Sequence, residues 1–157
     1  MSKVCNLPDL RQAQISDKPI LKDMLEAYLS ELSAFGEVGD EYPYFDAYWQ
    51  DVDARWPYLF LEGESPVGFA LVRAPEEGGV DFSMAEFSIV PGSRQRGYGR
   101  MMASAVMRRH PGSWNVAIMA GNEPAKAFWP KAIAAADAQR VRHGLDEDGP
   151  FYRFVIG

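Results

Sequence analysis

Apolar side chains recur at helical spacing in three stretches of the chain. The spacing i, i+3, i+4, i+7 places such residues on one face of a helix, so each stretch predicts an amphipathic helix. The first stretch starts at Asp17, where Ser16 or Asp17 is expected to cap the helix, and ends near Gly36. The second ends before Pro111. The apolar positions are Leu21, Met24, Leu25, Tyr28, Leu29 and Leu32 in the first stretch, Tyr98, Met101, Met102, Ala105 and Val106 in the second, and Ala125, Phe128, Trp129, Ala132 and Ile133 in the third.

Between the first two helices the pattern changes to that of strands. Residues 56–61 and 66–73 flank the polar turn 62–65, which predicts a hairpin. Further elements are a short helix near 44–52 and strands over 80–90, 114–119 and 151–156. This order of elements predicts an α/β or α+β sheet with helices on both faces.

Composition narrows the class of protein. The chain has 157 residues, of which 47% are apolar and one, Cys5, is a cysteine. A chain of this size can bury about 70% of its unfolded surface, so we expect one domain over residues 1–157 without a structural metal or disulfide. A single cysteine favours a reducing cytoplasm. No stretch reaches the roughly 20 apolar residues that span a bilayer, and an acidic chain is a poor nucleic-acid partner, so we expect neither membrane nor nucleic-acid binding.

The net charge of −6 is unevenly distributed. Residues 87–122 hold five arginines and no acidic residue, whereas residues 23–54 hold nine acidic residues and no lysine or arginine. The acidic run either keeps exposed faces soluble or forms part of a binding site. The arginines point to an anionic ligand.

The segment from Glu86 to Arg100 is the most informative part of the sequence. A strand ends at Val90 and a helix opens near Gly97, with a loop between them that is rich in glycine and arginine. Backbone amides at glycines and at a helix N-terminus form an anion site that suits a pyrophosphate. No Lys-Ser or Lys-Thr follows, and the third glycine of a dinucleotide fingerprint is missing, so neither a Walker loop nor a Rossmann fold is expected. The alternative is a glycine-rich turn with solvated arginines.

This segment resembles the acetyl-CoA loop of the GNAT superfamily of N-acetyltransferases, and residues 87–91 resemble the strand end that precedes it. A second stretch, residues 122–129, is similar to the later motif in which an asparagine opens the fourth helix and aromatic residues follow. The resemblance implies a single GNAT-like α/β (α+β) domain. Its central sheet would be mixed and mostly antiparallel, with about six to seven strands and about four helices. It also implies acetyl-CoA as cosubstrate, and no metal.

The resemblance assigns cofactor contacts to named residues. The fourth and fifth strands would splay apart, and the pantetheine arm would bond to the main chain of Ile89 and Val90. The pyrophosphate would be held by the Arg94 side chain and by the amides of Gln95, Arg96, Gly97, Tyr98, Gly99 and Arg100. Asn122, Phe128 and Lys131 would line the other side of the cofactor. Alternatively, Asn122 only caps its helix, Phe128 only packs in the core, and Lys131 is only solvated.

Amine acetylation needs a base that takes the ammonium proton, and Glu86 is the candidate. Strand alternation places it on one face with Phe82, Met84 and Val90, where apolar neighbours would raise its pKa toward neutrality. The alternative is a glutamate paired with an arginine such as Arg94.

The proton donor for the departing thiolate is open. The family commonly has a tyrosine in the fourth helix, where this chain has Trp129, whose indole is not an acid at neutral pH. Tyr98, Tyr152 or water are the alternatives. His110 and His143 are interpreted as structural or exposed.

The first two helices usually form the acceptor wall in this family. Here that region is the acidic run, interleaved with Tyr42, Tyr44, Tyr48 and Trp49. Carboxylates and aromatic faces attract cations, so a cationic small molecule or a lysine side chain is the expected acceptor, attacking acetyl-CoA directly in a ternary complex. The alternatives are an acyl-CoA-binding module without catalysis and a partner-binding protein that uses the acidic aromatic loop. Either a monomer or a homodimer is expected.

Overall fold

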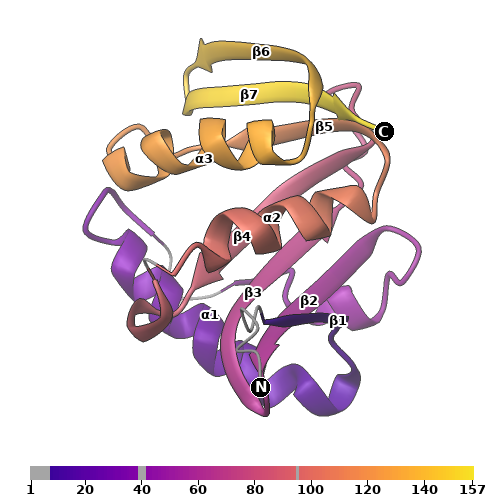
Figure 1. Cartoon of the computed structure of the whole chain (residues 1–157), viewed down its shortest axis with the longest axis vertical. Helices are drawn as coiled ribbons and strands as arrows, with labels where there is room; N and C mark the ends of the chain where they lie inside the picture. The colour runs from indigo at the N-terminus through magenta and orange to yellow at the C-terminus, as the bar shows by residue number, and fades with distance from the viewer. Residues whose placement is uncertain (1–7, 39–41, 95) are drawn as a thin grey trace, which may run out of the picture.

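Seven strands form one sheet in the order β1-β2-β3-β4-β5-β7-β6 (Figure 1). The computed structural model describes residues 8–38, 42–94 and 96–157. All neighbouring strands are antiparallel except the parallel pair β4 and β5. The strands are β1 (Asp9–Gln12), β2 (Arg55–Glu62), β3 (Ser65–Arg73), β4 (Phe82–Ile89), β5 (Gly112–Ala117), β6 (Gln139–Asp146) and β7 (Gly149–Ile156).

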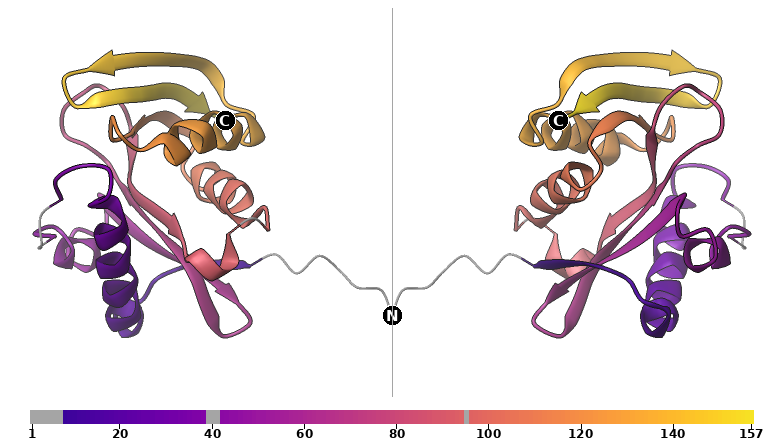
Figure 2. Two further views of the ribbon diagram at one scale, coloured as in Figure 1. Left: turned by 90° about the vertical axis from the view of Figure 1, so that its left-hand side faces the viewer. Right: turned by 90° about the vertical axis from the view of Figure 1, so that its right-hand side faces the viewer.

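Three α-helices cover the two faces of the sheet. Helix α1 (Lys18–Leu32) lies on one face, and α2 (Tyr98–Arg108) and α3 (Glu123–Ala135) lie on the other (Figure 2). Single 3-10 turns occur at Ile15–Asp17, Asp46–Trp49 and Pro91–Ser93. No helix in the described ranges is long and apolar enough to cross a membrane.

Each face of the sheet carries its own hydrophobic core. The core beneath α2 and α3 includes Trp114 and Val106, both 0% exposed. The core beneath α1 includes Leu21 at 0% and Tyr48 at 1%. A sheet with a buried residue set on both faces accounts for the long apolar runs of β2 and β3.

The fold class expected from the sequence is confirmed, with differences at the ends of elements. The additional short helix expected near residues 44–52 is only the 3-10 turn Asp46–Trp49. Helix α1 ends at Leu32, before Gly36, and its cap residue Asp17 uses its carboxylate elsewhere. The carboxylate accepts hydrogen bonds from the Gln14 amide at 2.9 Å and from Arg11 at 2.6 Å. Cys5 lies outside the described residues.

Strands β4 and β5 separate soon after they pair. Their parallel ladder consists of Phe82 opposite Trp114 and Ser83 opposite Asn115. Beyond Ser83 the register contains no further β4–β5 pair among the described residues. The splay implied by the family resemblance is therefore present, and it opens the sheet between its two halves.

A bulge in β4 lies next to this splay. Leu71 of β3 pairs with Glu86, whereas the next β3 residue, Val72, pairs with Met84, so Ala85 is an extra residue in β4. A bulge changes which face the following side chains occupy. The expected shared face of Glu86 with Phe82 and Met84 is therefore wrong.

Candidate active site

The splay between β4 and β5 belongs to a cavity of about 940 Å³ that reaches both faces of the sheet. Its walls come from α1, from β4 and β5, from the loop before α2, and from α3. Nine of the thirteen residues assigned from the sequence to catalysis or cofactor binding line it: Glu86, Ile89, Arg94, Gly97, Gly99, Arg100, Asn122, Phe128 and Lys131. Val90, Arg96 and Tyr98 do not line it, and Gln95 lies outside the described residues.

Glu86 lies in the wall of this cavity on the α1 side of the sheet. Burial raises the pKa of Glu86 to about 7, although hydrogen bonding from the hydroxyls of Tyr42 and Tyr28 opposes the rise. Burial raises the pKa of Glu86, as expected from the sequence, but the bulge places the carboxyl group on the α1 side of the sheet, where the tyrosine hydroxyls oppose the rise. A carboxyl group of this kind is partly ionised at neutral pH and can accept a proton there.

The tyrosines around Glu86 are themselves perturbed. Burial first, and then the charge of Glu86, raises the pKa of both Tyr28 and Tyr42 well above the ordinary value. Both therefore keep their protons at neutral pH and can donate to the carboxylate. The tyrosine ring of Tyr28 also packs edge-on against Phe69, with ring centroids 5.7 Å apart, which anchors it to the sheet.

Gly97 and Gly99, at the start of α2, are required for different steric reasons. Gly97 has φ of +77°, a left-handed conformation that other residues adopt at a cost, and it forms the N-cap of α2. Gly99 is required for close packing, because a Cβ there would meet Cε1 of Phe128 at 2.9 Å. The amides of Gly99 and Arg100 lie in the first helical turn, where backbone N–H groups have no intrahelical acceptor. They can therefore face an anion.

Arg94 is held away from the role expected for its side chain. Its Nε donates to the carbonyl oxygen of Ile89 at 2.7 Å, and its two terminal nitrogens donate to the Glu31 carboxylate at 2.8 and 3.0 Å. The alternative of a Glu86–Arg94 pair is therefore wrong. Arg100 and Lys131 also line the cavity, and neither forms an ion pair with any residue of the described ranges.

The main chains of Ile89 and Val90 differ in what they can offer a ligand. The Val90 amide donates to the Val67 carbonyl at 2.8 Å, and its carbonyl accepts from the Ser93 amide at 2.9 Å. Backbone groups of successive strand residues point to opposite sides, so the Ile89 amide and carbonyl face the splay. The Ile89 main chain therefore suits strand-like pairing with pantetheine better than that of Val90, although the Ile89 carbonyl already accepts a hydrogen bond from Arg94 Nε.

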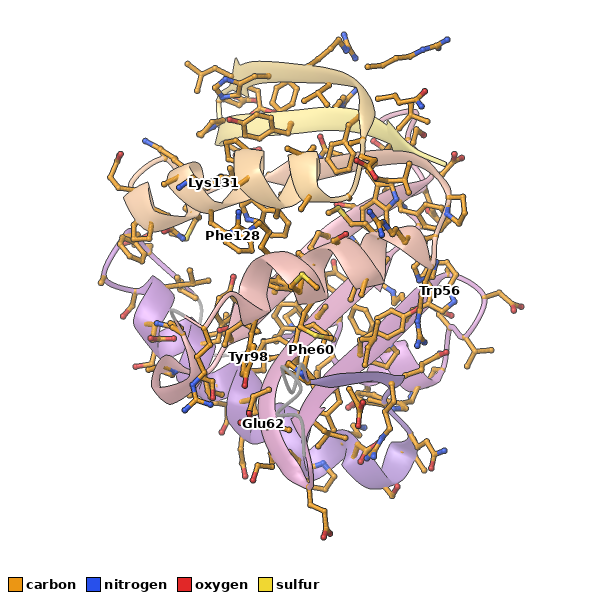
Figure 3. The ribbon with its side chains drawn as sticks, viewed as in Figure 1. Trp56, Phe60, Glu62, Tyr98, Phe128 and Lys131 are labelled. Carbon is orange, nitrogen blue, oxygen red and sulfur yellow. The ribbon has the colours of Figure 1, made fainter. Side chains whose placement is uncertain are left out.

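The side chains of Arg96 and Tyr98 turn to the β2–β3 hairpin. Both contact Glu62, Arg96 through an ion pair of 3.4 Å and Tyr98 through its hydroxyl, which donates to the carboxylate (Figure 3). Tyr98 is only 6% exposed. Any contact of these two residues with a cofactor is thus left to their main-chain amides.

Helix α3 supplies the opposite wall. Asn122 caps the helix, since its Oδ1 accepts from the Ala125 amide at 3.1 Å, and it also lines the cavity. Phe128 extends from α3 toward α2 and stacks on Phe87 with ring centroids 5.6 Å apart (Figure 3). Trp129 is 7% exposed and lines the cavity where the family commonly has a tyrosine. Helix α3 therefore provides a capping residue, core residues and part of the cavity wall.

Most of the acidic aromatic stretch serves the fold instead of the cavity. Asp46 pairs with Lys18 at 2.6 Å, and Trp49 donates from Nε1 to the Ala13 carbonyl at 3.3 Å. Tyr48 is buried, whereas Tyr44 is 60% exposed. Asp40 and Glu41 lie outside the described residues. Of the described acidic residues in this stretch, Glu31 is the one that lines the large cavity.

The sequence analysis expected an acceptor wall from the first two helices but assigned no α1 residue to the site. Tyr28, Glu31 and Phe35 line the cavity, but Tyr28 was assigned only to the apolar face of its helix. The spacing of Tyr28 and Glu31, three residues apart, was a signal that both lie on neighbouring parts of one face. No three His, Cys, Asp or Glu side chains gather in a way that could hold a metal ion within the described part of the chain.

A family model described as the Acetyltransferase (GNAT) family matches residues 21–133. The chain belongs to the GNAT acetyltransferase family. It is accordingly an acetyl-CoA-dependent N-acetyltransferase, and the alternative of a binding module without catalysis is set aside.

Solved structures share the fold of this acetyltransferase at low sequence identity. A GNAT-family acetyltransferase from Staphylococcus aureus Mu50 is 11% identical with a TM-score of 0.72, covering 96% of this chain and 99% of that one. The PaiA N-acetyltransferase from Thermoplasma acidophilum, solved with coenzyme A, is 10% identical with a TM-score of 0.64, covering 94% and 98%. The aminoglycoside acetyltransferase AAC(6′)-Ib, solved with coenzyme A and kanamycin, is 14% identical with a TM-score of 0.64, covering 94% of each chain. No curated protein sequence matches this chain.

Proposed function

We propose that this acetyltransferase transfers the acetyl group of acetyl-CoA to a primary amine on a cationic small molecule or a lysine side chain, by direct attack in a ternary complex. The observation that carries the proposal is the single cavity that is lined on one side by Glu86 and on the other by the N-terminus of α2. One cavity with both features can hold two substrates side by side, and such proximity supplies much of the rate of a bimolecular reaction.

The residues present fit coenzyme A. The amides of Gly99 and Arg100 in the first turn of α2, together with the side chains of Arg100 and Lys131, provide an anion site for phosphates. The Ile89 main chain offers strand-like pairing to pantetheine, and Phe128 and Asn122 close the α3 side. Acetyl-CoA supplies the activated thioester when it is bound. The chain's own residues hold and orient it.

Glu86 is proposed as the base that takes the proton from the acceptor ammonium, directly or through water. Its pKa of about 7 leaves a sizeable fraction ionised at neutral pH, and Tyr28 and Tyr42 fix the carboxylate in place. For the departing thiolate we propose water as the proton source. A thiol has an ordinary pKa near 8.5, whereas the raised pKa of Tyr28 makes that hydroxyl a weak acid.

A cationic acceptor is supported by the carboxylates on the α1 side of the cavity, and a small molecule by the related enzyme solved with kanamycin. The single cysteine favours a cytoplasmic location.

Two experiments test the proposal. Acetyl-CoA should raise the melting temperature, because a ligand at a hundred times its Kd adds about 2.7 kcal/mol of stability. Thiol release across a panel of amines should then reveal turnover, and Glu86→Gln should slow it near neutral pH while the acetyl-CoA shift remains. No melting shift would reject the cofactor site, and an unchanged rate in Glu86→Gln would reject Glu86 as base.

A further inference from the structure

Arg94 is tied at three points to two different elements. Its Nε bonds to the Ile89 carbonyl of β4, and its terminal nitrogens form a two-point ion pair with Glu31 of α1 at 2.8 and 3.0 Å. The pair is open to solvent, with side chains 43% and 39% exposed. It joins the loop that leads to the anion site with the helix that lines the α1 side of the cavity.

Glu31 lies between two cavities. It lines the large cavity, and it also lines a second cavity of about 210 Å³, as do Tyr28 and Ser88. Asp23, two turns earlier on α1, lines the second cavity as well and forms no ion pair with a described residue. Without Arg94, this wall would therefore present two carboxylates and no cation.

Coenzyme A bound in the large cavity would compete with Glu31 for the Arg94 guanidinium. Arg94 lines the large cavity together with Gly97, Gly99 and Arg100, which form the proposed phosphate site. A pyrophosphate carries more negative charge than one carboxylate and also accepts two-point hydrogen bonds from arginine. Its binding there attracts Arg94 away from Glu31. Because the ion pair is exposed, breaking it changes an equilibrium constant only about 1.4- to 5-fold.

We propose that Glu31 is a binding residue for a second cationic group of the acceptor, covered by Arg94 in the free enzyme and uncovered when coenzyme A takes Arg94. This inference rests on the proposed function and adds a substrate class to it, namely amines with a second positive charge. Coupling between sites is reciprocal, so coenzyme A and such an acceptor each tighten the binding of the other.

Calorimetric titration with coenzyme A tests the competition without an acceptor. Glu31→Gln is expected to bind coenzyme A about 1.4- to 5-fold more tightly than the wild type, and Arg94→Gln more weakly. In the Arg94→Gln background, Glu31→Gln should not change the affinity for coenzyme A. Glu26→Gln is the matched control, because Glu26 is exposed on the same helix and forms no ion pair with a described residue. The gain should vanish with pantetheine, which has no phosphate.

The results distinguish a failure of the proposed function from a failure of the competition for Arg94. If wild-type enzyme fails to bind coenzyme A, the proposed function itself fails. If it binds but Glu31→Gln binds no more tightly than Glu26→Gln, or keeps its gain in the Arg94→Gln background, the competition is overturned.

Binding of 1,4-diaminobutane, compared with butylamine, tests the acceptor half. Coenzyme A should increase the affinity for the diamine about 1.4- to 5-fold and leave the affinity for butylamine unchanged. Glu31→Gln should remove the gain in affinity for the diamine. A diamine that does not bind, or a gain that survives in Glu31→Gln, would overturn the role of Glu31.

Discussion

Met84 and Glu86 face opposite sides of the sheet although a single residue separates them in β4. Met84 belongs to the core beneath α2 and α3, whereas Glu86 interacts with Tyr28 and Tyr42 beside the core of α1. The bulge at Ala85 accounts for the reversal. It carries the carboxyl group into a partly buried position beside Tyr28 and Tyr42.

That position makes the stability of the protein depend on pH. The folded-state pKa of Glu86 is about 7, above its ordinary value of 4.5, so the folded state binds this proton more tightly than the unfolded state. The stability due to Glu86 is therefore present below pH 4.5 and lost as the pH rises through 7. The loss amounts to about 3 kcal/mol at most. We expect Glu86→Gln to gain up to this amount relative to wild type between pH 4 and pH 8.

Urea unfolding of wild type and Glu86→Gln at pH 4, 6 and 8 measures this difference. Glu26→Gln, at an exposed position of α1, serves as the control and should follow the wild type. Parallel stability curves for wild type and Glu86→Gln would contradict a buried carboxyl group.

The same ionisation should appear in the rate. If Glu86 is the base, kcat/KM rises with pH and levels off above about 7, because only the carboxylate accepts a proton. Thiol release measured from pH 5.5 to 9 with one acceptor checks this. Glu86→Gln should lose the limb near pH 7, whereas Glu26→Gln should keep it. An amine of pKa near 10 contributes a separate limb at higher pH. A wild-type kcat/KM that shows no rise between pH 5.5 and 7.5 would argue for a solvated base.

Local sequence rules were sufficient for the start of α2 and for the cap of α3. The helix that opens at Tyr98 follows from apolar spacing, and the left-handed N-cap at Gly97 follows from a glycine before that helix. Asn122 as the cap of α3 is equally local, since its acceptor contact is with Ala125, three residues later. These features depend on neighbours in the chain, which a sequence displays directly.

The α1 side of the site depends on relationships that periodicity does not contain. Alternation assumes no extra residue in a strand, so the bulge at Ala85 reversed the predicted face of Glu86. The Glu31–Arg94 pair joins residues 63 apart, and nothing in either segment indicates the other. Strand β6 was missed because it is exposed on both faces, so no apolar alternation marks it.

Gly97 and Gly99 should respond differently to alanine because their constraints differ. A Cβ on Gly99 lies 2.9 Å from Cε1 of Phe128, and overpacking of this kind costs about 1–3 kcal/mol. In a Phe128→Ala background the clash is gone, and Gly99→Ala should stabilise by up to about 1 kcal/mol through helix propensity. Gly97→Ala has open space around its Cβ but a φ of +77°, so it should cost about 1 kcal/mol in both backgrounds.

Unfolding free energies of the six proteins, each alanine variant and its parent in both backgrounds, give the comparison. An equal effect of Gly99→Ala in the two backgrounds would show that Phe128 moves aside without cost.

His110 should oppose Glu86 in the pH dependence of stability. His110 is 8% exposed, and its Nε2 lies 2.6 Å from the hydroxyl of Tyr58. Burial, followed by the charge of Arg109, lowers the pKa of His110 below its ordinary value of 6.5. The unfolded state therefore takes up a proton that the folded state resists. The stability due to neutral His110 is present above pH 6.5 and lost as the pH falls toward the folded pKa.

The stabilising contribution of Glu86 decreases as the pH rises, and that of His110 decreases as the pH falls. The two effects therefore partly cancel in the wild type. In the Glu86→Gln background only the His110 effect is left. The free energy of unfolding should therefore decrease from pH 7.5 to pH 5.5, and adding His110→Gln should remove that decrease.

Tyr58→Phe should lower the free energy of unfolding by about 1 kcal/mol at pH 8, because it removes the hydroxyl from a buried pair. Tyr152→Phe, beside the exposed His143, should cost less. If His110→Gln left the slope unchanged, a different group would have to be the buried base.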